Sequence, residues 1–268
     1  MRSVLFCPAS NARALKKLRN LHCDAVIVDL EDAVGHVNKS DARSAARDAF
    51  ENGFGKNQIA ALRINASDSV EYCADIALAR EIQPDAVVLP KAEHPHQIDT
   101  LVADLNLPVW LMIETAMGVA NVGKLAAHKR VMALILGPND LRVSLGAGED
   151  VNRSALLYSI GASVAAARAH RKWVFDGVFN NFRDEVGFTA EAQQGKLLGF
   201  NGKTLIHPSQ IEPANQIFGT LEAEILRAKR VISAFEAGDG NAVQLDGELI
   251  EELHVTAALD LLRKNGEL

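Results

Sequence analysis

Eight short apolar segments recur along the chain, and the stretches between them are long enough for helices. The segments end at turn signals and lack strict apolar–polar alternation, which is typical of parallel strands covered on both faces. The expected strands are 3–8, 25–29, 59–65, 86–91, 109–114, 132–137, 173–179 and 202–207. The clearest helix spans 152–170, with Asn152 as its N-cap. Eightfold alternation of strand and helix predicts an α/β fold, a (β/α)8 TIM barrel.

A doubly wound sheet would alternate in the same way. However, Cys7-Pro8-Ala9-Ser10-Asn11, which ends the first segment, is not a glycine-rich dinucleotide loop.

The pattern changes after Ile217, where no further strand and helix pair follows. The expected elements there are a helix over 221–236, a break at 238–240, a polar stretch with Asp246-Gly247 and a last helix from about 252 to 263. We therefore predict a barrel for residues 1–236 and a C-terminal helical lid or arm for 237–268.

Composition narrows the class of protein. A chain of 268 residues suits one undivided α/β barrel, and a hydrophobic content of 48% argues against disorder. The formal net charge of −6 predicts no basic face, and therefore no nucleic-acid partner. The first residues are too short for a signal segment, and no apolar stretch approaches a bilayer-spanning length. We expect a cytoplasmic protein without a membrane partner.

The three cysteines, Cys7, Cys23 and Cys73, are widely spaced and odd in number. Their spacing matches no metal-ligand or redox motif, so we expect reduced cysteines that serve in packing.

Two carboxylates and an arginine lie at or just after the carboxyl end of an expected strand: Glu114, Asp140 and Arg63. Because the active site of an eight-stranded barrel is built at the carboxyl ends of its strands, we expect these side chains to converge. Two oxygen donors beside a guanidinium suit a divalent cation and a small organic acid. The alternative is that each acid only caps the helix that follows it.

Other charged residues also lie at expected strand ends, and each has a structural alternative. These candidates are Asp29, Glu31, Asp32, Lys91, Glu93, Asp176 and His207. Glu31 and Asp32 could cap a helix or pair with Lys39 or Arg43, and Asp176 could form an ion pair inside the barrel. We expect His207, which precedes Pro208, to be a hydrogen-bonded structural histidine.

The ordered set of motifs resembles the citrate lyase β-subunit-like enzymes of the HpcH/HpaI aldolase superfamily, which include malyl-CoA and citramalyl-CoA lyases. The motifs are Arg2-Ser3-Val4-Leu5-Phe6-Cys7-Pro8, Asp29-Leu30-Glu31-Asp32-Ala33-Val34, Arg63-Ile64-Asn65, Leu89-Pro90-Lys91, Ile113-Glu114-Thr115, Gly137-Pro138-Asn139-Asp140-Leu141, Gly199-Phe200-Asn201-Gly202-Lys203 and Ile206-His207-Pro208. The resemblance covers nearly the whole expected barrel.

The resemblance implies roles for particular residues. Glu114 and Asp140 would ligate Mg²⁺, with Glu114 also contributing to substrate binding, and Arg63 would bind the substrate's carboxylate and carbonyl oxygen. Basic residues of the first helix would bind coenzyme A phosphates; they are Arg13, Lys16 and Lys17. The resemblance also implies a homo-oligomer, a trimer or hexamer. The structural alternative for the basic residues is a solvated helix face.

The chain departs from the family pattern at two places. Pro8-Ala9 stands where Pro-Gly is usual, and Gly247-Glu248-Leu249-Ile250-Glu251 stands where the lid of the acyl-CoA lyases ends in an aspartate. Glu251 is then the expected acid/base, but its extra methylene moves the carboxyl group by about an ångström, a displacement that can cost about 100-fold in rate. The alternative for Glu251 is an exposed acid at a helix start.

The expected reaction is magnesium-dependent cleavage or formation of a carbon–carbon bond in a 3-hydroxy-3-carboxyacyl-CoA, such as malyl-CoA or citramalyl-CoA, which gives acetyl-CoA and a 2-oxo acid. One alternative is a citrate lyase β subunit that acts on citryl-acyl-carrier protein. Another is a metal-dependent aldolase that acts on free hydroxy acids. A third is a barrel that binds an acyl-CoA or a protein without turnover.

Overall fold

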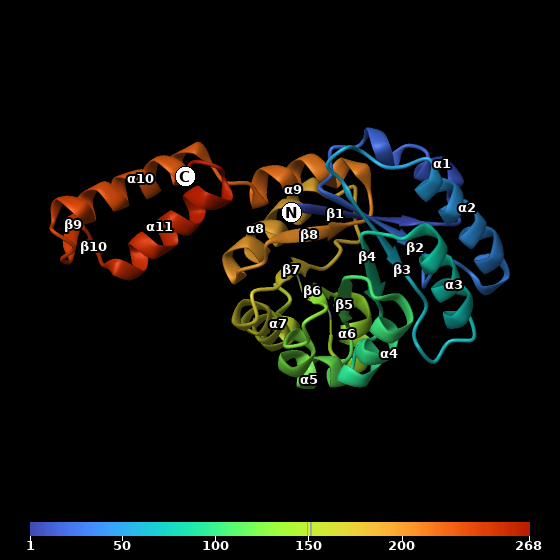
Figure 1. Cartoon of the computed structure of the whole chain (residues 1–268). Coiled ribbons are helices and arrows are strands. Elements are labelled where there is room, and N and C mark those ends of the chain that lie inside the picture. Colours follow the sequence, from blue (N-terminus) through green and yellow to red (C-terminus); the bar gives the residue numbers. More distant parts are fainter. Residues whose placement is uncertain (149, 151) are drawn as a thin grey trace. The chain divides into compact units, whose positions relative to one another are not determined.

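The computed structural model describes residues 1–148, 150 and 152–268. Among these residues, eight parallel strands close a barrel in which each strand pairs with the next in sequence and β8 pairs with β1 (Figure 1). The strands are β1 Ser3–Pro8, β2 Ala25–Asp29, β3 Ile59–Arg63, β4 Ala86–Leu89, β5 Val109–Ile113, β6 Val131–Leu136, β7 Trp173–Asp176 and β8 Gly202–Leu205. The predicted (β/α)8 barrel is confirmed.

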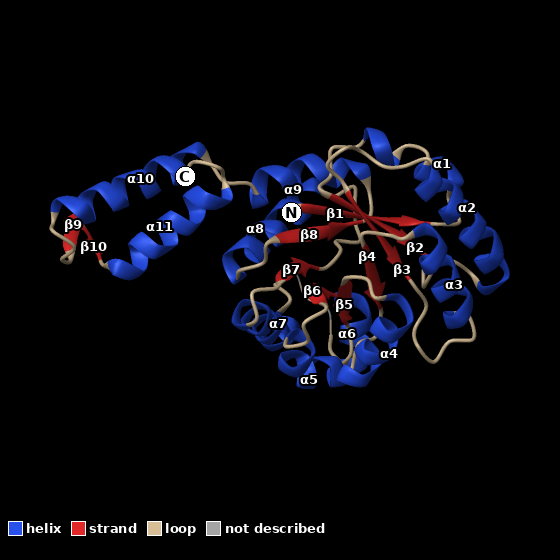
Figure 2. Ribbon diagram, viewed as in Figure 1, coloured by secondary structure: helices blue, strands red, loops and turns tan. Residues whose placement is uncertain are grey.

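Helices surround the strands on the outside of the barrel, as Figure 2 shows. They are α1 Ala12–Leu15, α2 Lys39–Glu51, α3 Tyr72–Ile82, α4 Pro95–Leu105, α5 Ala116–Ala126, α6 Pro138–Leu145, α7 Leu157–Ala169, α8 Glu185–Leu198 and α9 Ile211–Phe218. Short 3-10 turns also occur at Leu18–Asn20, His36–Asn38, Ser154–Leu156 and Pro208–Gln210. No helix in the described part of the chain has the length and apolar character that a bilayer crossing needs.

The interior of the barrel is a small apolar core in which large and small side chains alternate. The rings of Trp110 and Phe175 lie with their centroids 5.7 Å apart. Alanines fill the narrower positions around them: Ala25, Ala61, Ala86 and Ala133. A second, larger apolar layer lies between the strands and the helices. Because both faces of the strands are covered, they are mostly apolar, with buried charged residues such as Asp29, Arg63 and Lys203 as exceptions.

The predicted start of the helix over 152–170 was wrong. Helix α7 begins at Leu157, and Arg153 before it has a φ of 55°, in the left-handed region, which an α-helix cannot include. Asn152 does not cap α7; its N–H instead donates to the Asp150 carboxylate at 2.8 Å.

The predicted boundary at residue 236 was also wrong, because the barrel unit ends at Phe218 and a second unit covers Gly219–Leu268. That unit contains α10 Glu222–Ala237, a hairpin of β9 Val243–Leu245 and β10 Glu248–Ile250, and α11 Glu252–Lys264. Helix α10 packs with α11 in a core of its own, built from Ala228, Val231, Ile250, Ala258 and Leu262. The hairpin turns at Asp246-Gly247, both at positive φ, as a two-residue turn requires.

The cysteines are free. Cys7 and Cys23 are buried as predicted, but Cys73 is exposed, so the prediction of a packing role was wrong for Cys73.

Candidate active site

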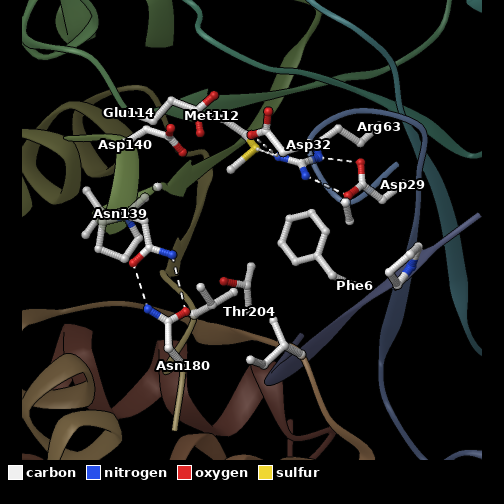
Figure 3. Close-up of a pocket in the computed structure, with 17 residues that line it drawn as sticks. Phe6, Asp29, Asp32, Arg63, Met112, Glu114, Asn139, Asp140, Asn180 and Thr204 are labelled. Carbon is white, nitrogen blue, oxygen red and sulfur yellow. Dashed lines mark hydrogen bonds and ion pairs between the residues drawn. The ribbon is translucent and has the colours of Figure 1, made fainter. Parts of the chain in front are cut away.

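The arginine at the end of β3 is buried and fixed by a carboxylate from the neighbouring strand. Asp29 ends β2 and pairs in register with Arg63. Arg63 Nε donates to Asp29 Oδ1 at 2.7 Å and Nη2 donates to Oδ2 at 2.6 Å (Figure 3). This two-pronged contact fixes the plane of the guanidinium as well as its position. It leaves the remaining edge of Arg63 toward the cavity.

Two softer contacts also hold the Arg63 guanidinium. Its central carbon lies 5.1 Å from the centroid of the Phe6 ring, in a cation–π geometry. Its Nη1 also donates to Met112 Sδ at 3.4 Å. Both partners come from the inner face of the barrel, so the arginine is anchored to the rigid sheet.

A second acid, Glu31, lies between two cations behind the cavity. Its Oε1 accepts a hydrogen bond from Lys91 Nζ at 2.9 Å, and its Oε2 lies 2.8 Å from Arg63 Nη1. This Oε2 is buried and accepts no hydrogen bond from any residue that the structure describes. Burial raises the pKa of Glu31 in spite of the positive charges of Arg63 and Lys91. Partial burial lowers the pKa of Lys91, but the hydrogen bond to Glu31 and its charge outweigh this and raise it.

Glu114 follows β5 directly and is almost completely buried. Its Oε1 accepts a hydrogen bond from the Lys91 backbone N–H at 2.7 Å, while its Oε2 has no hydrogen-bond partner within the described chain. Burial, followed by the negative charge of Glu31, raises the pKa of Glu114 to about 8. Gly137 makes room for this carboxylate, because a Cβ there would lie 2.6 Å from Oε2.

Asp140 lies in the first turn of α6, and its carboxylate points toward Glu114 in Figure 3. Neither acid caps the helix after it, since Thr115 is the N-cap of α5 and Gly137 occupies the N-cap position of α6. The capping alternative is therefore wrong for both acids.

These side chains surround one cavity of about 370 Å³ at the carboxyl ends of the strands. Arg63, Glu114 and Asp140 all line it, so the structure brings the three predicted residues together. Asp29, Asp32, Phe6, Thr204, Asn139 and Asn180 complete much of its wall.

The donor set of the cavity fits a hard divalent cation. Glu114 and Asp140 offer carboxylate oxygens, and the buried, unpartnered Oε2 of Glu114 is an acceptor that such an ion would satisfy. Within the described residues, no group of three or more His, Cys, Asp or Glu side chains is arranged to hold a metal. An ion held by two carboxylates would keep positions for water and substrate, as Mg²⁺ commonly does.

Three predicted strand-end residues contribute nothing to this cavity. Asp176 lies on the outer side of β7, where it pairs with Lys203 at 2.8 Å, and not inside the barrel. His207 N-caps a 3-10 turn and contacts Ser209, as expected of a structural histidine. The backbone N–H of Glu93 donates to Gln97 at the start of α4. Glu251 is exposed and takes the N-cap position of α11 in the second unit.

The expected partners of Glu31 and Asp32 were wrong. Lys39 Nζ donates to the backbone carbonyls of Leu30 and Glu31, at 2.6 and 2.8 Å, and so fixes the loop after β2. Arg43 pairs with Glu71 and Asp75 on the outside of the barrel.

Sequence reasoning missed Phe6, Met112, Asn139, Asn180 and Thr204. For Phe6 a signal was present: side chains alternate along a strand, so Phe6 shares its face with Val4 and Pro8. The reciprocal amide contact of Asn139 and Asn180, at 2.9 and 3.2 Å, joins the first turn of α6 to the loop after β7, which no local motif connects.

Comparison with known proteins places the chain among enzymes of related chemistry. Residues 2–208 match the model of the HpcH/HpaI aldolase/citrate lyase family. The chain is 42% identical to a (3S)-malyl-CoA thioesterase of Cereibacter sphaeroides, over 98% of this chain and 94% of that protein. It is 31% identical to a citrate lyase subunit beta of Leuconostoc mesenteroides subsp. cremoris, over 98% and 92% of the two chains.

A solved structure is similar to this chain over almost its whole length. CitE of Mycobacterium tuberculosis, in complex with magnesium, acetoacetate and coenzyme A, is 28% identical with a TM-score of 0.86, over 99% of this chain and 98% of that one. The chain therefore belongs to the HpcH/HpaI aldolase/citrate lyase family of carbon–carbon lyase-type enzymes.

Proposed function

We propose that this protein is a magnesium-dependent enzyme that cleaves, or forms, a carbon–carbon bond in a 3-hydroxy-3-carboxyacyl-CoA such as malyl-CoA. The observation that carries the proposal is the cavity in which Glu114 and Asp140 face Arg63, with Glu114 Oε2 buried and unpartnered in the described chain. Such a site binds a hydroxy acid through its oxygens and leaves the thioester arm outside. The family relationship and the magnesium-containing complex of CitE support the same chemistry.

Glu114 and Asp140 are the residues that would hold Mg²⁺. When bound, the ion polarises the oxygens of the hydroxy acid and lowers the pKa of its hydroxyl group. Glu114 is aligned for this by the Lys91 N–H, which occupies one oxygen and leaves the other for the ion.

Arg63 has the geometry to bind the substrate's carboxylate and to stabilise charge on the oxygen of the departing 2-oxo acid. Asp29 takes two of its five N–H donors and Met112 takes a third; because Asp29 also fixes the guanidinium plane, the two remaining donors are aimed before substrate arrives. Donors that are already aligned with developing charge need no reorganisation during the reaction.

Glu251 is the candidate for removing the hydroxyl proton, after which the carbon–carbon bond breaks to a 2-oxo acid and a thioester enolate. The basis is its position at the end of the Gly247–Glu251 stretch, and its place in a separate unit is in keeping with a lid. In a Glu251→Gln variant we expect kcat to fall about 100-fold, the low end for a general base, with magnesium affinity unchanged. Glu252→Gln is the matched control, because Glu252 is the next exposed acid of α11. Equal activity of the two variants would place the base within the barrel, at Asp32 or Asp29.

Coenzyme A would be held by its phosphates. Three exposed basic residues lie on α1 or directly after it: Arg13, Lys16 and Lys17. In the sequence, α1 closely follows β1, which contains the cavity residue Phe6. Substituting Arg13 and Lys17 by Met should raise KM for the thioester and leave glyoxylate affinity unchanged.

Hydrolysis of the same thioester is a second candidate, and the 42% identity to a malyl-CoA thioesterase favours it. Burial raises the pKa of the Cys7 thiol to about 12, so this cysteine is neutral and a poor nucleophile. Hydrolysis by attack of water would give malate and free coenzyme A as products.

One assay separates the candidates. Malyl-CoA is incubated with magnesium or with EDTA, and the products are quantified. Glyoxylate and acetyl-CoA in equal amounts support carbon–carbon cleavage, whereas malate and free thiol support hydrolysis. Citramalyl-CoA, citryl-acyl-carrier protein and free malate complete the panel. Absence of magnesium-dependent turnover of every thioester would contradict the proposed function.

A further inference from the structure

Lys91 contacts two parts of the site: Glu114 on one side, and Glu31, which faces Arg63, on the other. It follows β4 with a φ of 48°, in the left-handed region that few residues other than glycine adopt. Strained backbone of this kind is kept where the surroundings impose it, and it gathers at functional sites. In this conformation the Lys91 N–H donates to Glu114 Oε1, at 2.7 Å.

The side chain of Lys91 reaches the other half of the cavity. Its ammonium lies 2.9 Å from Glu31 Oε1 and 3.8 Å from Asp32 Oδ1. Glu31 Oε2 in turn lies 2.8 Å from Arg63 Nη1 but makes no hydrogen bond with it. Glu31 therefore pairs with two cations. Because Lys91 neutralises part of the negative charge of Glu31, Arg63 does not have to neutralise all of it.

We infer that Lys91 is the positioning residue that joins the two halves of the site: its backbone N–H orients Glu114, and its ammonium holds Glu31 so that Arg63 keeps free donors for the substrate's carboxylate. The inference rests on the proposed function, because it assigns the free edge of Arg63 to a 2-oxo or hydroxy acid. Lys91 does not touch the substrate and is not a Schiff-base lysine; its ammonium is already paired.

The two roles of Lys91 separate in one variant. Lys91→Met keeps the backbone N–H and most of the side-chain length but removes the charge. We expect its affinity for glyoxylate, measured by calorimetry with saturating magnesium, to fall about tenfold, as for one lost hydrogen bond between charged groups. Magnesium affinity without substrate should stay within about threefold, because the N–H to Glu114 remains.

Three comparisons test whether the effect is specific. Lys91→Arg should restore most of the glyoxylate affinity, since it keeps the positive charge. Lys56→Met, the same change at an exposed position before β3, should change neither affinity. In a Glu31→Gln background, Lys91→Met should change glyoxylate affinity less than about twofold, because the charge through which Lys91 acts is gone.

The outcomes are distinguishable. Equal glyoxylate affinity of the wild type and Lys91→Met would overturn the inference, and so would additive effects of the Lys91 and Glu31 substitutions. Loss of magnesium binding in Lys91→Met would show that the ammonium, not the N–H, orients Glu114, and would also overturn it. Failure of the proposed function shows instead in the wild type, as magnesium and glyoxylate binding with no thioester turnover.

Discussion

Two of the buried clusters of charged residues in the described part of the barrel differ in how completely their hydrogen bonds and charges are satisfied. In the cluster between β7, β8 and α8, Asp176 accepts hydrogen bonds from Arg153 at 2.6 Å and from Lys203 at 2.8 Å. Lys203 also donates to Glu191 at 2.7 Å, so two acids face two bases.

The cluster at the carboxyl ends of β2 to β6 is incomplete by comparison. Its acids outnumber its cations, since Arg63 and Lys91 face Asp29, Glu31, Asp32, Glu114 and Asp140. Two carboxylate oxygens, Glu31 Oε2 and Glu114 Oε2, are buried without a hydrogen bond from the described residues. Buried charge left in this state is costly unless a ligand completes it. We therefore propose that the balanced cluster serves the fold and that the unbalanced one serves binding.

The sharpest test of this contrast neutralises one glutamate in each cluster. In Glu114→Gln we expect magnesium binding to disappear and turnover to fall about 1,000-fold, because the ion loses an anionic ligand. The fold should survive, since the amide fits the same space. Calorimetry and the product assay are the measurements, and Asp140→Asn should behave in the same way.

Glu191→Gln is the matched control in the balanced cluster. The substitution removes the negative charge that lies 2.7 Å from Lys203. The free energy of unfolding should therefore fall by about 1–3 kcal/mol, while magnesium affinity is unchanged. If Glu191→Gln lost magnesium and Glu114→Gln kept it, the functional assignment of the two clusters would be reversed.

A smaller effect is expected from the two buried arginines. Arg63→Lys keeps the charge but loses the two-pronged contact with Asp29, so kcat/KM should fall about 100-fold. Arg153→Lys should lower stability by about 1–3 kcal/mol and leave kcat/KM within about threefold. Thermal denaturation and steady-state kinetics on both variants decide the point. A kinetically normal Arg63→Lys would make Arg63 a structural arginine like Arg153.

The sequence predicted the barrel and the three residues that meet in its cavity because one rule covers both. Parallel strands in a closed barrel all end at one rim, so Arg63, Glu114 and Asp140 had to lie there once the strands were recognised. Predicting that these three residues converge therefore required no knowledge of distances between them. The same rule cannot tell which face of a strand a side chain takes near its end, and so it placed Asp176 wrongly.

The contacts of Lys91 and the domain boundary depend on information that periodicity does not carry. Lys91 adopts a left-handed φ just after β4 and its N–H donates to Glu114, and no local sequence pattern predicts either feature. The helix over 222–237 has the same amphipathic pattern whether it covers the barrel or packs on α11. Only the packing shows that this helix belongs with α11. The predicted end of the barrel was therefore eighteen residues too late, at 236 instead of 218.

The smallest expected effect is a pH dependence that the unbalanced cluster alone should produce. The pKa of Glu114 is about 8 in the metal-free protein, so below this pH magnesium has to displace a proton. Affinity for magnesium should therefore fall by up to about tenfold for each pH unit below about 8. Because the folded state binds this proton more tightly than the unfolded state, metal-free stability should decrease as pH rises from the ordinary carboxyl range toward 8.

Calorimetry of magnesium binding at several pH values, in buffers of different ionisation enthalpy, measures both the affinity and the proton released. Glu191→Gln should keep the whole pH dependence, because its carboxylate belongs to the balanced cluster. Glu114→Gln should remove the contribution of Glu114 to the pH dependence of metal-free stability, whereas Glu31, whose pKa is also raised by burial, keeps its own contribution. A magnesium affinity that is constant between pH 6 and 8 in the wild type would mean that Glu114 is already ionised there. Burial and the negative charge of Glu31 would then not raise the pKa of Glu114 enough to keep it protonated. The excess of negative charge in this cluster would be smaller than its count of acids and cations indicates.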